Sequence, residues 1–262
     1  MYSLIAAFFG LAVGSFLNVC IFRIPKAQSI VFPASHCMAC QHPIAPSDNI
    51  PVVSFLILKG RCRHCSGKIS WQYPLVEILT AFLFVLFYYF FGITLKGVLY
   101  LVFSLALLVE TFIDLEHQII PDAITLPGIV IGLAASCGFP GIQGETLHWA
   151  GFLKSFIGMI AGGGFFYLIG VLAERILKKE ALGGGDIKLL AMIGAFLGWQ
   201  AVAWTIFVSS LIGSVVGLAL RIKSGQERIP FGPFIALGAF AYLFLGPRVI
   251  LWYVHSFGIY GY

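Results

Sequence analysis

Long apolar runs dominate the sequence and limit what the chain can fold into. A helix needs about 20 apolar residues to cross the hydrocarbon core of a bilayer. Of the 262 residues, 60% are hydrophobic and only 10% are charged, whereas about a quarter of the residues of a soluble domain are charged. The runs predict an all-α polytopic membrane protein with about eight transmembrane helices, at residues 2–22, 73–92, 95–113, 119–138, 150–173, 187–198, 201–220 and 231–253.

The first apolar run is expected to stay in the chain rather than to act as a cleaved signal peptide. No basic residue precedes it, and Arg23 and Lys26 follow it, which is the reverse of the charge order in a signal peptide. The stretch 187–220 is broken at residues 198–200. We therefore expect two helices there, the first of them short.

Lysine and arginine are distributed unequally between the two sides of the membrane. If the N-terminus lies outside, thirteen of the 16 fall in loops on one side, and only Lys96, Lys154 and Arg248 fall on the other. Cytoplasmic loops carry the excess of Lys and Arg, so the larger set faces the cytoplasm and both chain ends face outward. This topology explains the net charge of +5 without a nucleic-acid partner. The larger set is Arg23, Lys26, Lys59, Arg61, Arg63, Lys68, Arg175, Lys178, Lys179, Lys188, Arg221, Lys223 and Arg228.

The longest polar stretch, about residues 23–72, contains two CxxC pairs. It is too short to build much of a core and needs a staple. Cys37 and Cys40 are followed, after twenty-one residues, by Cys62 and Cys65. This spacing is typical of a structural zinc site with four thiolate ligands. The alternative is a pair of disulfides or redox-active dithiols, which a cytoplasmic location disfavours. His36, His42 and His64 lie beside the thiols and could replace one of them, but they fit better as residues that surround the site or face solvent.

Two aspartates at the ends of apolar segments are the candidate catalytic groups. Asp114 ends the third segment, and Asp186 begins the sixth after Gly183, Gly184 and Gly185. The predicted topology puts both at the cytoplasmic edge of the membrane, where an ionisable group is a functional candidate. Two carboxyls that share one proton can activate a water for peptide hydrolysis. Glycines, which lack side chains, leave room for the second carboxyl, the water and an extended peptide.

Each acid also has a structural interpretation. Asp186 fits as an acid at a helix N-terminus, and Asp122, directly after Pro121, fits as the cap of the fourth helix. Glu110, one helical turn before Asp114, fits as a buried partner of a cation or a hydroxyl, and Glu116 is a further candidate acid. Near the N-terminus, Gly10, Gly14 and Ser15 form a small-residue face for helix packing.

Six ordered motifs resemble the bacterial type IV prepilin peptidases, a family of GxGD aspartic membrane proteases. These enzymes are the bifunctional leader peptidases and N-methyltransferases of type IV pilus and type II secretion systems. The motifs are GSFLNVCIFRIP (14–25), CMAC (37–40), NIPVVSFLILKGRCRHC (49–65), ISWQYPLVE (69–77), FIDLEHQIIPD (112–122) and GGGDIKLL (183–190). GxGD alone is a weak signal, but the ordered set is specific. Met38 departs from the proline that many members carry there.

The resemblance implies a multi-pass protein of the bacterial inner membrane that acts on prepilins or pseudopilins. Asp114 and Asp186 match the catalytic aspartates, and Cys37, Cys40, Cys62 and Cys65 match the zinc ligands. The family removes a basic leader on the cytoplasmic side, generally after a glycine. It then methylates the new N-terminal amine, usually of phenylalanine, with S-adenosylmethionine. Residues 1–92 are expected to serve methylation, and residues 93–262 to form the peptidase core.

The residues of the S-adenosylmethionine pocket are less well marked. No glycine-rich nucleotide-binding fingerprint follows a strand, so such a pocket would be built from the polar insert and the neighbouring helix ends. Arg23, Asn49 and Glu77 are the candidates.

Two other functions are compatible with parts of the sequence. A proton-coupled transporter would use Asp114 and Asp186 as a relay, but it predicts acids near the middle of the bilayer and inverted repeats. A non-enzymatic scaffold would use the zinc insert to bind assembly proteins, but it leaves the glycine–aspartate run without a purpose.

Overall fold

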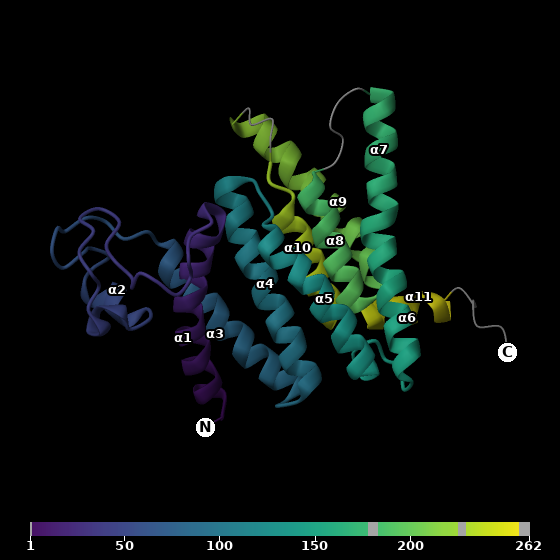
Figure 1. Ribbon diagram of the computed structural model, residues 1–262, viewed down its shortest axis with the longest axis horizontal. Coiled ribbons are helices and arrows are strands. Elements are labelled where there is room, and N and C mark those ends of the chain that lie inside the picture. Colours follow the sequence, from purple (N-terminus) through teal and green to yellow (C-terminus); the bar gives the residue numbers. More distant parts are fainter. Residues whose placement is uncertain (1, 178–182, 225–228, 257–262) are drawn as a thin grey trace. The chain divides into compact units, whose positions relative to one another are not determined.

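The computed structural model describes residues 2–177, 183–224 and 229–256, which form helices and connecting loops without an extended strand (Figure 1). The chain divides into two compact units, Met1–Val109 and Glu110–Tyr262. This confirms the all-α prediction. Of the basic residues assigned to the cytoplasmic side, Lys178, Lys179 and Arg228 lie outside the described residues.

Among the described residues, five helical stretches are long and apolar enough to cross a membrane, and one bent pair of helices adds a sixth. The five are α1 (Tyr2–Arg23), α3 (Gln72–Phe91), α4 (Leu95–His117), the continuous stretch of α6 (His148–Met159) and α7 (Phe165–Leu177), and α9 (Trp199–Ser224). The bent pair is α10 (Gly232–Phe244) and α11 (Gly246–Ser256), with an angle of 66° between them.

Two of the eight expected segments form shorter helices. The segment 119–138 forms α5 (Asp122–Gly138), of 17 residues, and the segment 187–198 forms α8 (Gly184–Leu197), of 14 residues. At 1.5 Å per residue these helices are about 25 and 21 Å long, against a hydrocarbon core of about 30 Å. The count of eight crossings therefore stays a prediction.

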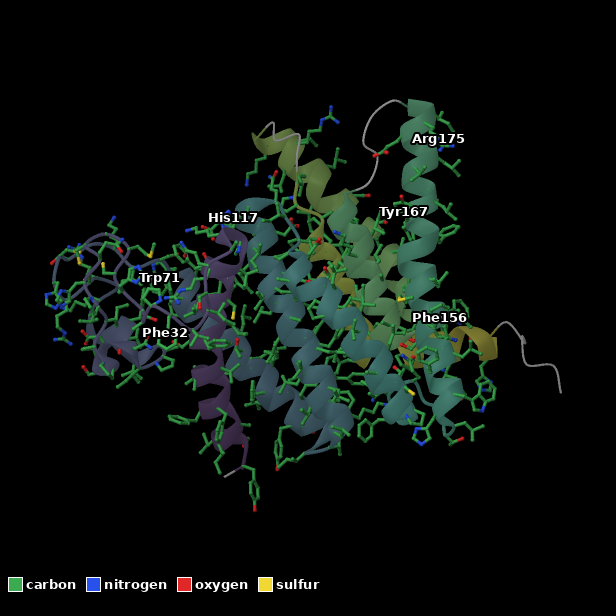
Figure 2. All side chains as sticks on the ribbon, in the orientation of Figure 1. Phe32, Trp71, His117, Phe156, Tyr167 and Arg175 are labelled. Atoms are coloured by element: carbon green, nitrogen blue, oxygen red, sulfur yellow. The ribbon has the colours of Figure 1, made fainter. Side chains whose placement is uncertain are left out.

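The α6–α7 stretch is continuous because a π-helical turn, Ile160–Gly164, joins the two helices. Much of its apolar surface is exposed, including Phe156 and Tyr167 (Figure 2). An exposed apolar surface on a helix of this length is expected of a segment that faces lipid.

In the first unit, α1 packs closely against α3. A Cβ atom at Gly10 would lie 2.5 Å from the Cα of Ala81, and one at Gly14 would lie 2.6 Å from the Cα of Glu77. Backbones this close require glycine, which confirms the packing role predicted for Gly10 and Gly14. Cys20 is buried in the same unit, whereas Cys137 of the second unit is exposed.

The polar insert between α1 and α3 has little regular structure. It contains the short helix α2 (Val53–Ile57) and 3₁₀ turns at Ile24–Lys26 and Pro46–Asn49. Arg63 forms a bidentate ion pair with Asp48, with N–O distances of 2.6 and 2.8 Å. The guanidinium of Arg63 lowers the pKa of the Asp48 carboxyl.

In the second unit, α8 is the buried helix. Its residues 189–197 are all buried, and it packs against α5 and α6 and against the π-helical turn. Gly158 of α6 and Gly194 of α8 meet at a close backbone crossing that excludes a side chain on either residue. The short helix that begins at the glycine–aspartate run is therefore held inside the unit rather than on its surface.

The C-terminal end of α8 is capped by polar side chains from neighbouring elements. Gln143 donates to the carbonyls of Ala195 (3.2 Å) and Phe196 (3.0 Å), and Ser155 also donates to Ala195. The last carbonyls of a helix have no partner within it. Here the carbonyls of Ala195 and Phe196 find these donors outside the helix.

Candidate active site and metal centre

Asp114 lies in the last turn of α4, and its side chain is buried. The backbone N–H of Gly232, the first residue of α10, donates a 2.9 Å hydrogen bond to Asp114 Oδ2. The two residues are 118 positions apart in the sequence. One carboxylate oxygen is thus held by a second helix.

Asp186 is the third residue of α8 and is partly exposed. A Cβ at Gly183 would lie 2.9 Å from Asp186 Oδ2, and one at Gly185 would lie 2.9 Å from the Cβ of Ile120. A Cβ at Gly184 would meet nothing within 4 Å. Two of the three glycines therefore make room for specific atoms, namely the carboxylate of Asp186 and the loop that follows Asp114.

Asp114 and Asp186 belong to the same unit, and their carboxyls are close enough for their charges to interact. Each lies at a helix end rather than in mid-helix. A transporter relay would need acids near the middle of the bilayer, so this placement favours an edge site. The carboxyl of Glu110 also interacts with that of Asp114.

The structural roles predicted for the other acids, Asp122 and Glu110, differ from what the structure shows. The prediction that Asp122 caps α5 is wrong: the N-cap is Pro121, and no side chain caps the helix. Asp122 instead forms an ion pair with Lys188 of α8, at 2.6 and 2.8 Å. Glu110 is 1% exposed, and neither of its oxygens has a hydrogen-bond partner among the described residues. The expected partner is therefore not found there, and Glu116 is exposed.

The four insert cysteines converge as the zinc prediction requires. Their Sγ atoms all lie within 4.8 Å of one another, and the Sγ atoms of Cys37 and Cys65 are 3.8 Å apart. With Zn–S bonds of about 2.3 Å, a tetrahedron has sulfur–sulfur edges of about 3.8 Å. All six cysteines are free thiols, and the chain has no disulfide in the described residues.

Each CxxC pair forms the same tight turn. The N–H of Cys37 bonds to the carbonyl of His42, and the N–H of Cys62 bonds to that of Gly67. Backbone N–H groups of Cys40 and Ala39 lower the pKa of the Cys37 thiol to about 6. At Cys40 the backbone hydrogen bond from His42 is outweighed by burial and by hydrogen bonds among the neighbouring thiols, which raise the pKa of the Cys40 thiol to about 11. The rings of His42 and His64 lie against each other with their centroids 3.5 Å apart. No histidine belongs to the group of ligand atoms found among the described residues.

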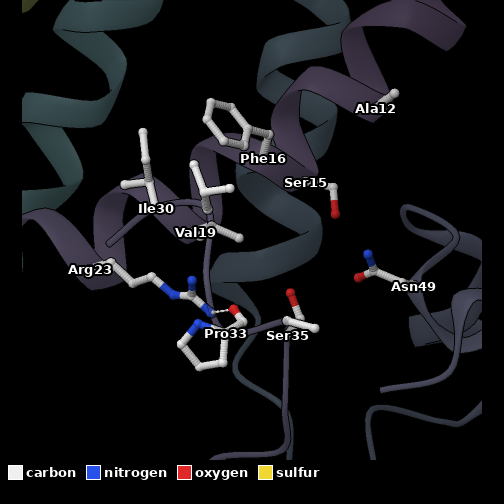
Figure 3. Close-up of a pocket in the computed structure, with 11 residues that line it drawn as sticks. Ala12, Ser15, Phe16, Val19, Arg23, Ile30, Pro33, Ser35 and Asn49 are labelled. Atoms are coloured by element: carbon white, nitrogen blue, oxygen red, sulfur yellow. Dashed lines mark hydrogen bonds between the residues drawn. The ribbon is translucent and has the colours of Figure 1, made fainter. Parts of the chain in front are cut away.

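A pocket of about 300 Å³ opens in the first unit between α1 and the insert (Figure 3). Ser15, Ser35 and Asn49 supply polar atoms to it, and Phe16, Val19 and Ile30 supply an apolar wall. The pocket therefore combines an apolar wall with a few polar groups.

Two of the three candidate cofactor residues line this pocket. Arg23 and Asn49 do so, but the guanidinium of Arg23 donates to the carbonyls of Ser29 (2.9 Å) and Pro33 (2.7 Å). Arg23 therefore holds the pocket wall in place. Glu77 is not a lining residue: its Oε2 accepts a 2.7 Å hydrogen bond from the N–H of Val52, which has a positive φ of 60°.

Sequence reasoning missed two features of these sites. Gly232 was not singled out, although a glycine directly before Pro233 is a signal for a helix start. Ser15 was assigned only to helix packing, yet it lines the pocket. Both residues depend on contacts with distant parts of the chain, which a local pattern does not reveal.

Comparisons with known proteins agree with the motif resemblance. Residues 8–91 match the bacterial peptidase A24 N-terminal domain, and residues 101–218 match the type IV leader peptidase family. Three curated relatives bear the name prepilin leader peptidase/N-methyltransferase. The Pseudomonas aeruginosa protein is 35% identical over 95% of this chain and 92% of its own length, and the Neisseria gonorrhoeae protein is 37% identical over 89% and 87%. The Myxococcus xanthus protein is 42% identical over 83% of this chain, but the match spans 62% of that relative. No solved structure matches the chain.

Proposed function

Because this chain belongs to the type IV leader peptidase family, we propose that it cleaves the basic leader of type IV prepilins or pseudopilins at the cytoplasmic edge of the inner membrane and then N-methylates the new N-terminus. The observation that supports the peptidase half is that Asp114 and Asp186 lie in one unit, with their carboxyls near enough for their charges to interact. Many curated relatives carry both activities in their names.

The proposed cleavage is general acid–base catalysis with an activated water. One aspartate removes a proton from the water as its oxygen attacks the scissile carbonyl carbon. The other donates its proton to the developing carbonyl oxyanion, which gives a tetrahedral diol. When that diol collapses, the C–N bond breaks and the departing amine takes up a proton from the pair. Because the water itself attacks the carbonyl carbon, this reaction needs no covalent acyl-enzyme intermediate.

For methylation, S-adenosylmethionine would supply the methyl group from the pocket beside α1. Ser15, Ser35 and Asn49 would orient its polar ends, and Arg23 would keep the wall formed by Ser29 and Pro33 in place. The new amine must lose a proton before it can accept the methyl group. Cys37, Cys40, Cys62 and Cys65 would hold a structural zinc ion, which would fold the insert that carries part of this pocket.

The cleavage half is tested with Asp114→Asn and Asp186→Asn, using a model prepilin and mass measurement of the mature N-terminus. Each variant is expected to lose cleavage by at least about a thousandfold, because an amide neither accepts nor donates the required proton. Glu116→Gln, which changes an exposed acid close to Asp114 in sequence, should keep normal cleavage. If a folded Asp186→Asn protein still cleaves the prepilin normally, the proposed mechanism is wrong.

The same assay, run with a precleaved pilin and S-adenosylmethionine, examines the methyl-transfer half. Ser15→Leu would fill the pocket and should abolish the mass increase of about 14 Da that one added methyl group produces. Cleavage of the prepilin should continue. Ser3→Leu places the same side chain at an exposed position on the same helix and should leave both activities intact. Normal methylation by Ser15→Leu would place the cofactor elsewhere.

A further inference from the structure

The proposed cleavage mechanism does not use the backbone N–H of Gly232, which donates a hydrogen bond to Asp114. Gly232 starts α10, and its amide hydrogen bond to Asp114 Oδ2 measures 2.9 Å. Both residues are buried and lie in the same unit. The contact therefore joins the end of α4 to the beginning of α10 at the candidate active site.

The atoms that a side chain at position 232 would meet first belong to Asp114. The three atoms nearest to a Cβ built on Gly232 all belong to Asp114: Oδ2 at 2.7 Å, Cγ at 3.2 Å and Cβ at 3.3 Å. The φ angle of Gly232 is not in the positive range that disfavours other residues. Its backbone would accept an L-amino acid, so a side chain is excluded by the carboxyl rather than by conformational strain.

The segment that carries this N–H is anchored on α9. The ring of Phe231 packs against Gly213 of α9, so closely that a Cβ at Gly213 would lie 2.9 Å from Phe231 Cε2. Phe231 also contacts Phe234, with ring centroids 6.1 Å apart. A donor on such a packed segment can hold its acceptor in one orientation.

We propose that Gly232 is a positioning residue for the peptidase reaction: its N–H and its missing side chain together fix the carboxyl of Asp114 in the orientation that catalysis needs. This inference rests on the proposed function. Because Oδ2 accepts the N–H of Gly232, Oδ1 is the oxygen that takes the proton from the water. No described group makes a comparable hydrogen bond to Asp186. The two aspartates are therefore unequal, and Asp114 is the base.

The test compares Gly232→Ala with Gly238→Ala on the same helix. The new methyl group at 232 would push the carboxyl of Asp114 aside, and we expect kcat for prepilin cleavage to fall about a hundredfold with KM changed by less than about twofold. A Cβ at Gly238 would crowd the carbonyl of Thr205 at 3.0 Å. Gly238→Ala should therefore lower thermal stability without a selective loss of kcat.

Methylation of a precleaved pilin gives an internal measure of folding, because the proposed methyl-transfer pocket lies in the other unit. Gly232→Ala should methylate this substrate at the normal rate. An ester at position 232, introduced by incorporating glycolic acid in place of glycine, removes the N–H without adding an atom that could clash. It should lower kcat about tenfold to a hundredfold, as expected for losing a hydrogen bond to a charged group, and it decides the matter if Gly232→Ala does not fold.

The outcomes separate the two proposals. If Asp114→Asn and Asp186→Asn lose cleavage while the ester variant keeps kcat within twofold of normal, Gly232 has no positioning role and the inference fails alone. A rise in KM at unchanged kcat would also overturn it, since it would show a role in binding the prepilin. If the two asparagine variants cleave normally, the proposed function fails, whatever Gly232 does.

Discussion

Glu110 is an ionisable residue in a buried site that offers it no hydrogen bond among the described residues. Its side chain is 1% exposed, and both oxygens lack a hydrogen-bond partner among the described residues. An ionised carboxylate in such a place is very costly unless it is paired. The carboxyl of Asp114, one helical turn away, adds repulsion against any charge on Glu110. Its environment therefore favours a group without charge.

Replacing Glu110 by leucine should make the protein more stable. The substitution removes two buried polar atoms without partners and puts an apolar side chain of similar size in their place. The expected gain in unfolding free energy is about 1–3 kcal/mol. Thermal unfolding in detergent micelles should show a higher midpoint for Glu110→Leu. Glu110→Gln, which keeps the unpartnered polar atoms, should show little gain. A lower midpoint for the leucine variant would mean that Glu110 binds a group that its present surroundings do not reveal.

At the scale of elements, the central feature is the short helix α8. It begins with Gly184, Gly185 and Asp186 and is buried through most of its length. Residues 189–197 of this 14-residue helix are buried in the protein, so its last carbonyls need partners from neighbouring elements. Gln143, Ser136 and Ser155 are these partners. These side chains therefore secure the helix that carries one of the two aspartates.

Gln143→Leu should destabilise the second unit. Its Nε2 donates to the carbonyls of both Ala195 and Phe196, and leucine leaves them with fewer donors in a buried site. The expected loss is about 1–3 kcal/mol of unfolding free energy, seen as a lower midpoint of thermal unfolding. Gln28→Leu, at an exposed position, serves as the control. An unchanged midpoint for Gln143→Leu would show that other groups satisfy the end of α8.

The elements that followed from the sequence are those with a local cause. Each of the eight apolar segments contains helix, because apolar periodicity and length are properties of one stretch of chain. The convergence of the cysteines was also predictable, because CxxC spacing encodes a tight turn. The start of α5 differs: Pro121 occupies the N-cap position and Asp122 is the first helical residue, whose carboxylate pairs with Lys188, distant in sequence. Likewise, the contact of Gly232 with Asp114 spans 118 residues and left no local pattern.

For the molecule as a whole, the sequence and the observed helix lengths give different numbers of membrane crossings. The apolar runs predict eight crossings, and the asymmetry of Lys and Arg predicts that both ends lie outside. The described helices supply five long spans and one bent pair, with α5 and α8 as the two short ones. The sequence and the helix lengths agree if α5 and α8 both cross the membrane. A short helix can cross where the bilayer is locally thinner. The α5–α6 loop would then lie outside.

Cysteine labelling of intact cells with a membrane-impermeant maleimide would decide this. In a Cys137→Ser background, Thr146→Cys in the exposed α5–α6 loop should react from outside. Lys223→Cys, exposed at the end of α9, should react only after the membrane is permeabilised, because the excess of Lys and Arg assigns it to the cytoplasm. If α5 does not cross, the loop after it shares the side of Asp114, and Thr146→Cys will stay unlabelled in intact cells. That result would require a different path for every helix after α4, and it would separate the basic loops from the side to which their charge assigns them.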